Sequence, residues 1–466
     1  MDTTARFDFD LLRRYDEFGP RYTSYPTAPH FHEGFGEAEL RQHAARSNAE
    51  LIPRPISIYL HIPYCTNPCF YCGCNRIITR DLSKGERYVE RLLREIARAA
   101  PLFDRDRDVV QVHFGGGSPN FLRPAQIGRL LDSLGRHFHF SDSPDRDFSI
   151  ELDPRHVDEA DIAELAALGI NRASLGVQDF NPVVQKAINR IQGIDQTLAV
   201  IEACRARGMR SVNVDLIYGL PKQTQAGFRG TVDTVIEARP DRVAIYGYAH
   251  LPQMFKAQKQ IRDEDLPGAG ERLELLALAV ECLTAAGYEY IGVDHFALPD
   301  DELAQALHRG GLHRNFMGYT THADSDLVGF GVSAISHVGS SYSQNPRDIT
   351  GWEIAIDHDR LPVWRGMTLD FDDELRAWVI QELMCRGEID RAGAERRFGI
   401  VFDAYFADEL ERLERLEDDG LVELDSGRIR ATSRGRYLLR IIAMCFDRYL
   451  QRTRPDRERP QFSRAV

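Results

Sequence analysis

The chain has 466 residues, of which 43% are hydrophobic and 28% are charged. This length and composition predict two or three globular domains, and they exclude a disordered chain and a small disulfide-stapled scaffold. Acidic residues outnumber basic ones by 71 to 58, so the net charge is −13 and we expect no nucleic-acid partner. The sequence contains no run of 18 apolar residues and no apolar signal segment, so we expect no membrane association and a cytoplasmic location.

Residues 1–50 are polar and irregular in pattern. They include GPRYTSYPTAPHF, from Gly19 to Phe31, which is rich in proline, tyrosine and threonine. This composition predicts an extended N-terminal arm. The arm is expected to act as a lid, and the alternative is a disordered terminus.

A βα pattern begins near residue 56. Apolar segments that end in glycine, proline or acidic residues predict strands at 57–63, 109–117, 148–154, 172–180, 211–221, 242–252, 288–297 and 328–336. Helical segments between them include 88–100, 158–169, 197–208 and 271–287. Repeated βα units predict a parallel sheet, either open or curled into a barrel, with its chemistry at the carboxyl ends of the strands. We assign residues 51–355 to this domain.

The pattern changes after about residue 360. The segment from Asp372 to Leu450 predicts helices and a small hairpin. We assign residues 356–466 to a helical, winged-helix-like C-terminal domain. Its acidic run, Glu411–Asp419, opposes phosphate binding.

Four of the eight cysteines crowd into one decapeptide directly after the first predicted strand: Cys65, Cys69, Cys72 and Cys74. In a cytosolic enzyme such crowding indicates metal or redox chemistry. The C-x3-C-x2-C spacing favours a [4Fe–4S] cluster held by the first three, with one iron left open. A four-thiolate zinc site and a redox pair of Cys69 with Cys72 are the alternatives. Three roles stay open for Cys74: it replaces a neighbouring cysteine as a cluster ligand, it places a thiol beside the cofactor, or it only packs.

The cysteine loop resembles that of the radical S-adenosylmethionine superfamily. Further segments narrow the match: RYTSYPT, YLHIPYCTNPCFYCGCNRIITR, VHFGGGSPNFL, IELDP, NVDLIYGLPKQT, LHRNFMGYTT and QFSRAV. Together they resemble the oxygen-independent coproporphyrinogen III oxidases over residues 20–466. The arm, Cys74 and the QFSR tail are the most specific of these features.

The resemblance implies a partial (β/α) TIM-like barrel and a radical S-adenosylmethionine oxidoreductase of haem biosynthesis. Two propionates of coproporphyrinogen III would become the vinyl groups of protoporphyrinogen IX. A propionate CH₂ is unactivated, so the reaction needs a cofactor-derived radical, here the 5′-deoxyadenosyl radical. The implied cofactors are one [4Fe–4S] cluster and two S-adenosylmethionine molecules. A reductant such as a flavodoxin or ferredoxin is the implied partner, and we expect a monomer.

The resemblance also implies site residues. The first S-adenosylmethionine would contact Tyr59, Tyr71, Gly116, Glu151, Ala249 and Ile335, and the second Gly117, Ser118, Gln178, Arg190 and Asp215. Glycines let the backbone approach the cofactor, and a carboxylate can accept hydrogen bonds from ribose hydroxyls. The candidate catalytic residues are Cys74, Tyr59 and Glu151.

The substrate carries four carboxylates and needs positive charge. Arg21 in the arm and His313 with Arg314 are the candidates, since arginine holds a carboxylate bidentately. Met317 stands where the family usually has glutamine, so an amide contact is lost there. A haem carrier without decarboxylase activity and a zinc-stabilised regulator are the competing functions.

Overall fold

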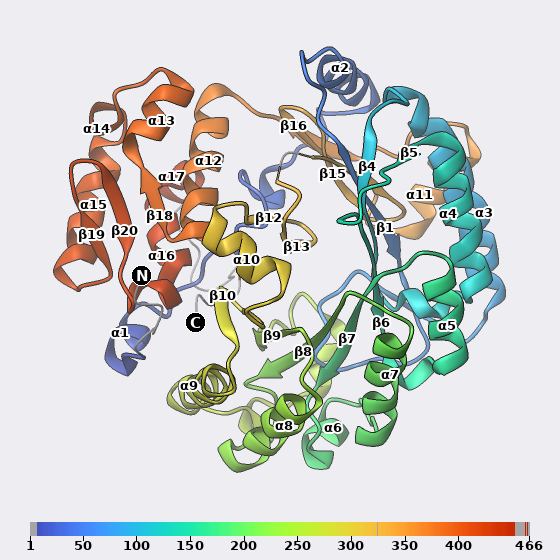
Figure 1. Cartoon of the computed structure of the whole chain (residues 1–466), viewed down its shortest axis with the longest axis horizontal. Helices are drawn as coiled ribbons and strands as arrows, with labels where there is room; N and C mark the ends of the chain where they lie inside the picture. Colours follow the sequence, from blue (N-terminus) through green and yellow to red (C-terminus); the bar gives the residue numbers. More distant parts are fainter. Residues whose placement is uncertain (1–6, 324, 453–461, 463, 465–466) are drawn as a thin grey trace. The chain divides into compact units, whose positions relative to one another are not determined.

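The computed structural model describes residues 7–323 and 325–452 together with Phe462 and Arg464 (Figure 1). Of the QFSR tail, Gln461 and Ser463 therefore lie outside the described residues. The chain forms two compact units. Unit 1 comprises Met1–His30, Pro267–Ala323 and Leu369–Val466, and unit 2 comprises Phe31–Leu266 and Asp324–Thr368. The division at residues 50 and 355 stays a prediction. Within the described part, no helix combines the length and the apolar character needed to cross a bilayer.

Unit 2 is built on a sheet whose seven parallel strands follow one another almost in chain order. They are β9 (Arg242–Gly247), β8 (Ser211–Tyr218), β7 (Arg172–Gln178), β6 (Asp147–Leu152), β4 (Asp108–Gly116), β1 (Ile56–Ile62) and β14 (Asp326–Phe330). Figure 1 shows them as a curved layer. This order and curvature confirm the predicted partial barrel. The antiparallel strands β15 (Ile335–His337), β16 (Ser341–Gln344) and β17 (Arg365–Thr368) extend it beyond β14.

Helices cover the outer face of this sheet. They are α3 (Ser83–Ala99), α4 (Pro124–His137), α5 (Glu159–Ala167), α7 (Ile194–Ala206) and α8 (Gln225–Ala238) (Figure 1). In α3, the side chains of Tyr88, Leu92 and Ile96 are fully buried, because their spacing of four places them on one helix face. Each crossover returns the chain to the same edge, so the carboxyl ends of the strands gather there.

Two predicted strands are wrong as single elements. The segment 288–297 is a hairpin of β10 (Glu289–Gly292) and β11 (His295–Ala297) in unit 1. The chain reverses at Gly292 and Val293, which both have positive φ. The segment 328–336 joins the end of β14 to the start of β15 through Gly331, whose φ is +94°. An alternating apolar pattern does not reveal such reversals, since it continues on both sides of the turn.

The prediction that residues 1–50 are irregular is also wrong in part. They contain α1 (Phe9–Arg14) in unit 1 and α2 (Glu37–Asn48) in unit 2. The N–H of Gly36 donates to the Glu39 carboxylate at 2.8 Å, which caps the first turn of α2. The low apolar content of α2 hid its helical periodicity.

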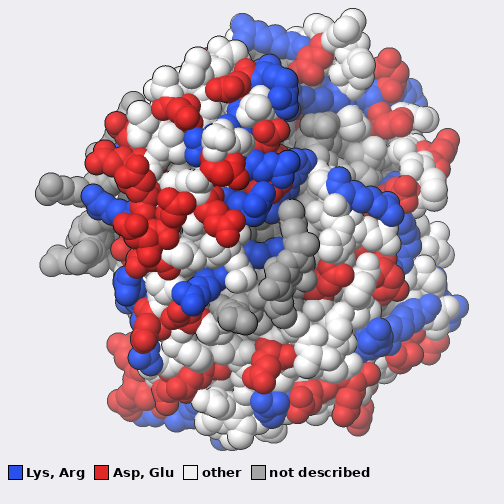
Figure 2. Space-filling view, turned by 60° about the vertical axis from the view of Figure 1, so that its left-hand side comes forward, with Lys and Arg blue, Asp and Glu red and all other residues white. Residues whose placement is uncertain are grey.

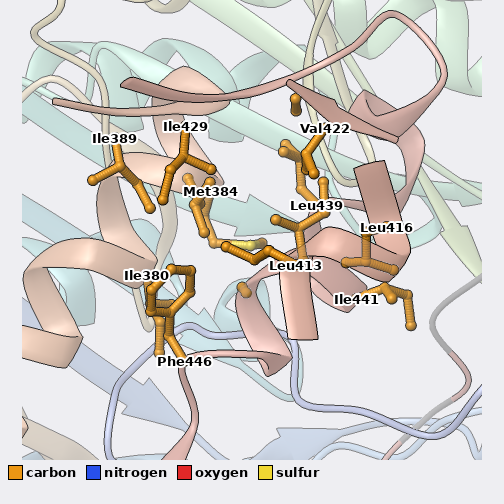
Figure 3. Close-up of a cluster of buried hydrophobic side chains, with 14 of the residues drawn as sticks. Ile380, Met384, Ile389, Leu413, Leu416, Val422, Ile429, Leu439, Ile441 and Phe446 are labelled. Atoms are coloured by element: carbon orange, nitrogen blue, oxygen red, sulfur yellow. The ribbon is translucent and has the colours of Figure 1, made fainter. Parts of the chain in front are cut away.

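Unit 1 has a largely helical core. Its C-terminal part contains α12 (Phe371–Arg386), α13 (Arg391–Phe398), α15 (Ala407–Asp418) and α16 (Leu439–Met444), with the small sheet β18 (Glu388–Asp390), β20 (Arg428–Ala431) and β19 (Val422–Leu424). Figure 3 shows Met384, Leu413 and Ile429 packed together in this core. The predicted helices and hairpin are confirmed, the hairpin as β19 and β20, with β18 as a third strand that was not predicted. Tyr22 and Tyr25 of the predicted arm are buried in the same core.

Candidate active site

The cysteine loop leaves the end of β1 and is closed at its base by a short parallel pair. Strand β2 (Tyr64–Cys65) pairs with β3 (Ile77–Ile78), with Cys65 opposite Ile78. The N–H of Thr79 donates to the Cys65 carbonyl at 2.9 Å. The loop between the two strands therefore projects from the strand-end edge of the sheet, and all four of its cysteines line one cavity of about 240 Å³.

Guanidinium groups surround these sulfurs. Arg190 Nη1 lies 3.6 Å and Arg155 Nη2 lies 3.8 Å from Cys69 Sγ. Arg76 donates to the carbonyl oxygens of Cys69 and Cys72, each at 3.0 Å. A hydrogen bond from Cys74 and the charge of Arg76 lower the pKa of Cys72 to about 6. Nearby cations favour thiolates, which are the form of cysteine that binds iron.

The residues fit an iron–sulfur cluster. Arg76 Nε and Arg190 Nε are buried without a hydrogen-bond partner among the described residues, so each has a donor for a bound group. No three His, Cys, Asp or Glu side chains in the described part converge on a single ion. In a [4Fe–4S] cluster each cysteine bonds a different iron, so its sulfurs need not converge on one ion.

A glycine segment at the end of β4 forms the neighbouring wall. Gly117 N–H donates to the Ile62 carbonyl at 2.8 Å, and Ser118 N–H donates to the Tyr64 carbonyl at 2.9 Å. These bonds hold the segment against the start of the cysteine loop. Gly116 has a φ of +115°, and a Cβ there would lie 2.5 Å from the His61 ring. Only glycine fits this approach without strain.

We expect Gly117→Ala to destabilise this wall. Its Cβ would lie 2.8 Å from the backbone carbon and oxygen of Pro63, which cannot move aside as a side chain can. The free energy of unfolding should fall by about 2 kcal/mol, measured by denaturant titration. Gly230→Ala in α8 is the matched control, because a Cβ there meets nothing within 4 Å. An equal loss of stability in both variants would contradict the prediction.

Two carboxylates in the cavity have opposite pKa shifts. Glu151 Oε2 accepts from Gly116 N–H at 3.0 Å, and Oε1 lies 3.4 Å from His113 Nε2. Burial opposes ionisation of Glu151, but His113 and the Gly116 N–H hold its pKa below the usual value. Burial raises the pKa of Asp215 to about 7, although Asn213 donates to it at 2.8 Å. Such shifts are typical of functional sites.

We expect Asp215→Asn to stabilise the protein more at high pH than at low pH. The folded state holds its proton up to about pH 7, whereas an unfolded aspartate loses it near 3.8, so stability falls as pH rises between these values. Asparagine cannot ionise, so it removes this pH-dependent loss of stability, and its side chain has nearly the shape of aspartate. Its gain in free energy of unfolding should be about 2 kcal/mol larger at pH 8 than at pH 5.5 in anaerobic denaturant titrations. A gain that is independent of pH would contradict this.

A buried ion cluster supports the floor of the cavity. Asp153 accepts from Arg155 Nη2 at 2.7 Å and from Arg190 Nη1 at 3.2 Å. Despite burial, these two guanidinium groups hold the pKa of Asp153 well below its usual range. Arg190 thereby joins the carboxylate to the sulfur of Cys69. Gln178 lies alongside with a φ of +70°, a conformation that non-glycine residues rarely adopt.

Comparisons with known proteins agree with this geometry. Residues 59–235 match the family model of the Radical SAM superfamily, and residues 369–438 match that of the HemN C-terminal domain. The chain is 50% identical to the oxygen-independent coproporphyrinogen III oxidase of Pseudomonas aeruginosa over 100% of both chains. It is 46% identical to that of Escherichia coli over 99% of this chain and 98% of the other. The chain belongs to the oxygen-independent coproporphyrinogen III oxidases.

The fold agrees as well. The solved structure of coproporphyrinogen III oxidase (HemN) from Escherichia coli, a radical SAM enzyme, matches with a TM-score of 0.91 and 44% identity, over 96% of this chain and 100% of that one. The chain is therefore a radical S-adenosylmethionine oxidoreductase of porphyrin and haem biosynthesis. Its family uses a [4Fe–4S] cluster and S-adenosylmethionine.

Most residues predicted for the oxidase site meet at the cavity. Its lining includes Cys65, Cys69, Tyr71, Cys72, Cys74, Gly116, Gly117, Ser118, Glu151, Gln178, Arg190 and Asp215. Tyr59, Ala249 and Ile335 are not among the lining residues. Tyr59 stacks on His113, and the Ala249 carbonyl accepts from Gln258, which also donates to the Tyr71 carbonyl at 2.8 Å. Ile335 begins β15.

The sequence interpretation missed two of the cations, Arg76 and Arg155. Arg76 lies in the recognised cysteine-loop motif, and Arg155 directly follows the recognised motif IELDP. The general excess of arginine over lysine hid them. Arg190 alone would look like a surface residue, yet only 5% of it is exposed.

The predicted substrate contacts lie in unit 1. The buried guanidinium of Arg314 stacks over Tyr319 at 4.8 Å, and its Nη1 has no hydrogen-bond partner among the described residues. Arg21 forms an ion pair with Asp294, and its carbonyl lies 3.4 Å from Arg314 Nε. Met317 lies in the turn between β12 (His313–Asn315) and β13 (Gly318–Thr320).

Proposed function

We propose that the chain converts two propionates of coproporphyrinogen III into the vinyl groups of protoporphyrinogen IX without oxygen. One observation carries this proposal: the cysteine loop, the glycine segment and two carboxylates line the same cavity at the strand ends. When bound, the [4Fe–4S] cluster and S-adenosylmethionine supply the radical that removes hydrogen from the unactivated CH₂. The residues of the chain bind and orient these groups and keep water away.

Each set of residues has its own task in this proposal. Cys65, Cys69 and Cys72 hold the cluster, with guanidinium groups beside Cys69 and Cys72, and the pKa of Cys72 is lowered to about 6. Glu151 stays ionised and accepts hydrogen bonds from ribose hydroxyls. Cys74 is placed beside Cys72, whose Sγ accepts from the Cys74 N–H at 3.4 Å. Cys74, Tyr59 and Glu151 are the proposed catalytic residues.

We also propose two S-adenosylmethionine molecules per chain. The first would contact Tyr59, Tyr71, Gly116, Glu151, Ala249 and Ile335, and the second Gly117, Ser118, Gln178, Arg190 and Asp215. All five residues of the second set line the same cavity as Tyr71, Gly116 and Glu151 of the first set, which is consistent with two neighbouring ligands. Equilibrium dialysis of the reconstituted protein should give a stoichiometry of two. One molecule per chain would reject the second site.

Substrate carboxylates are proposed to bind Arg21, His313 and Arg314. The unpartnered Nη1 of Arg314 supports this, because a buried donor without an acceptor is costly and a propionate would satisfy it. The Tyr319 ring holds the guanidinium in place.

A further set of proposals concerns the location, the oligomeric state and the partners of the enzyme. We propose a cytoplasmic monomer that takes electrons from a flavodoxin or ferredoxin and binds neither membranes nor nucleic acid. Figure 2 shows acidic side chains gathered on the left of the face that it draws, with basic ones interspersed. Such a surface, in a chain with a net charge of −13, gives little attraction for phosphate backbones.

The test is an anaerobic product assay. The reconstituted, reduced protein is incubated with coproporphyrinogen III and S-adenosylmethionine, and the products are separated by chromatography. We expect protoporphyrinogen IX and two CO₂ per substrate. Tight haem binding without a vinyl product would favour a carrier, and one zinc per chain without sulfide would favour a regulator.

A further inference from the structure

Beside the cysteine loop, unit 2 exposes a surface that contains two large apolar side chains. Ile78 pairs with Cys65 through the backbone of β3, and 42% of Ile78 is exposed. Leu82, just before α3, is 50% exposed. Exposed apolar side chains that cluster, rather than lie scattered, mark interaction sites. We call Ile78, Arg80, Leu82, Lys84 and Arg123 the docking surface.

A second cavity, of about 230 Å³, opens within this surface. It is lined by Leu82, by Arg123 and by apolar side chains that include Phe121, and Thr66 completes it. Thr66 directly follows Cys65 and also lines the cluster cavity. The two cavities therefore share a residue of the cysteine loop, which places a partner seated here beside that loop.

The charge of the docking surface is opposite to that of the chain. Arg80 and Arg123 are exposed, and Lys84 is half-buried. None of the three forms an ion pair within 4 Å of a carboxylate among the described residues. Arg80 instead donates to the neutral Asn67 amide at 3.2 Å. The surface also holds two carboxylates: exposed Asp81, which pairs with Arg87 at 3.8 Å and lies near the charge of Lys84, and Asp161 in the second cavity. Cations therefore outnumber carboxylates around the apolar centre, which fits a partner with an acidic rim.

We propose that this surface docks an acidic electron-carrier protein of the flavodoxin or ferredoxin type. The inference rests on the proposed function, which needs a reductant. In the transfer, the reduced carrier loses one electron and the oxidised [4Fe–4S] cluster gains it, and no bond is formed or broken. These cations are distinct from the residues proposed to bind the substrate carboxylates, Arg21, His313 and Arg314, and none of the five residues lines the cofactor cavity.

The experiment compares two triple variants as reconstituted full-length enzymes. Arg80→Glu/Lys84→Glu/Arg123→Glu reverses the docking surface. Its control carries the same charge change at exposed arginines without an ion pair among the described residues: Arg46→Glu, Arg105→Glu and Arg136→Glu. Purified flavodoxin is the probe, and its Kd is measured by calorimetry at low and high salt. Turnover is measured with reduced flavodoxin and, separately, with dithionite.

We expect the first variant to bind flavodoxin about tenfold more weakly at low salt, with a smaller difference at high salt. Its turnover with flavodoxin should fall in parallel. Its turnover with dithionite should stay within about twofold of the parent, because charges at the rim of an interface affect the association of the two proteins and not the reaction in the cavity. The control should bind like the parent. If both triple variants bind flavodoxin equally well, or if only the turnover with dithionite falls, the proposed role of the docking surface is wrong. Failure of the proposed function is distinguishable, because then dithionite would give no product with the parent either.

Leu82→Ser tests the apolar part independently. We expect it to weaken flavodoxin binding at both salt concentrations, because its contribution is burial and not charge. Its side chain is half exposed, so the fold should tolerate the change. Unchanged affinity in Leu82→Ser would remove the second cavity from the docking surface.

Discussion

Cys69→Ala should abolish the brown colour and the activity together. The Cys69 sulfur lies within 4 Å of the guanidinium groups of Arg155 and Arg190, so alanine leaves two cations without their sulfur and the cluster without one of three bonds. A protein with the cluster should contain about four iron and four sulfide per chain. We expect the variant, purified without oxygen, to retain little of either, measured by iron and sulfide analysis and by visible absorption.

Cys74→Ala is the matched control, since it removes a thiol from the same loop and cavity. The spacing predicts that this variant keeps its cluster. Loss of activity with the cluster retained would place the Cys74 thiol beside the cofactor. If Cys69→Ala keeps full activity, or if Cys74→Ala loses the cluster while Cys72→Ala keeps it, the ligand assignment is wrong.

The sequence predicted the parts of the site that depend on local pattern. The resemblance assigned Glu151 and Asp215 to cofactor sites, and both line the cavity, Glu151 near the end of β6 and Asp215 within β8. The cysteine spacing predicted a common centre, and the four side chains do line one cavity. These inferences need only local motifs and their spacing.

What the sequence left open depends on long-range packing. Tyr22 and Tyr25 are polar-looking arm residues, yet they are buried because they pack into a core made by residues near 380–446. The role of Arg155 depends on Cys69, 86 residues away, and that of Arg190 depends on a carboxylate 37 residues away. The raised pKa of Asp215 comes from burial, which no local pattern records.

Glu151→Gln should weaken S-adenosylmethionine binding while leaving the cluster in place. The carboxylate accepts from Gly116 N–H at 3.0 Å and stays ionised beside His113, so its charge is available to ribose hydroxyls in the cavity. Glutamine keeps the length but loses the charge, and hydrogen bonds to charged groups contribute about 1.5–3 kcal/mol. We expect the Kd for S-adenosylmethionine to rise roughly 10- to 100-fold, with activity lowered at least as much.

The test separates binding from assembly. Iron content and absorption should equal those of the parent, because Glu151 contacts no sulfur among the described hydrogen bonds and ion pairs. Glu159→Gln, on the exposed side of α5, is the matched control and should leave the Kd unchanged. If Glu151→Gln instead lost the cluster, the carboxylate would act by supporting the fold of the glycine segment, and its assignment to the cofactor would be wrong.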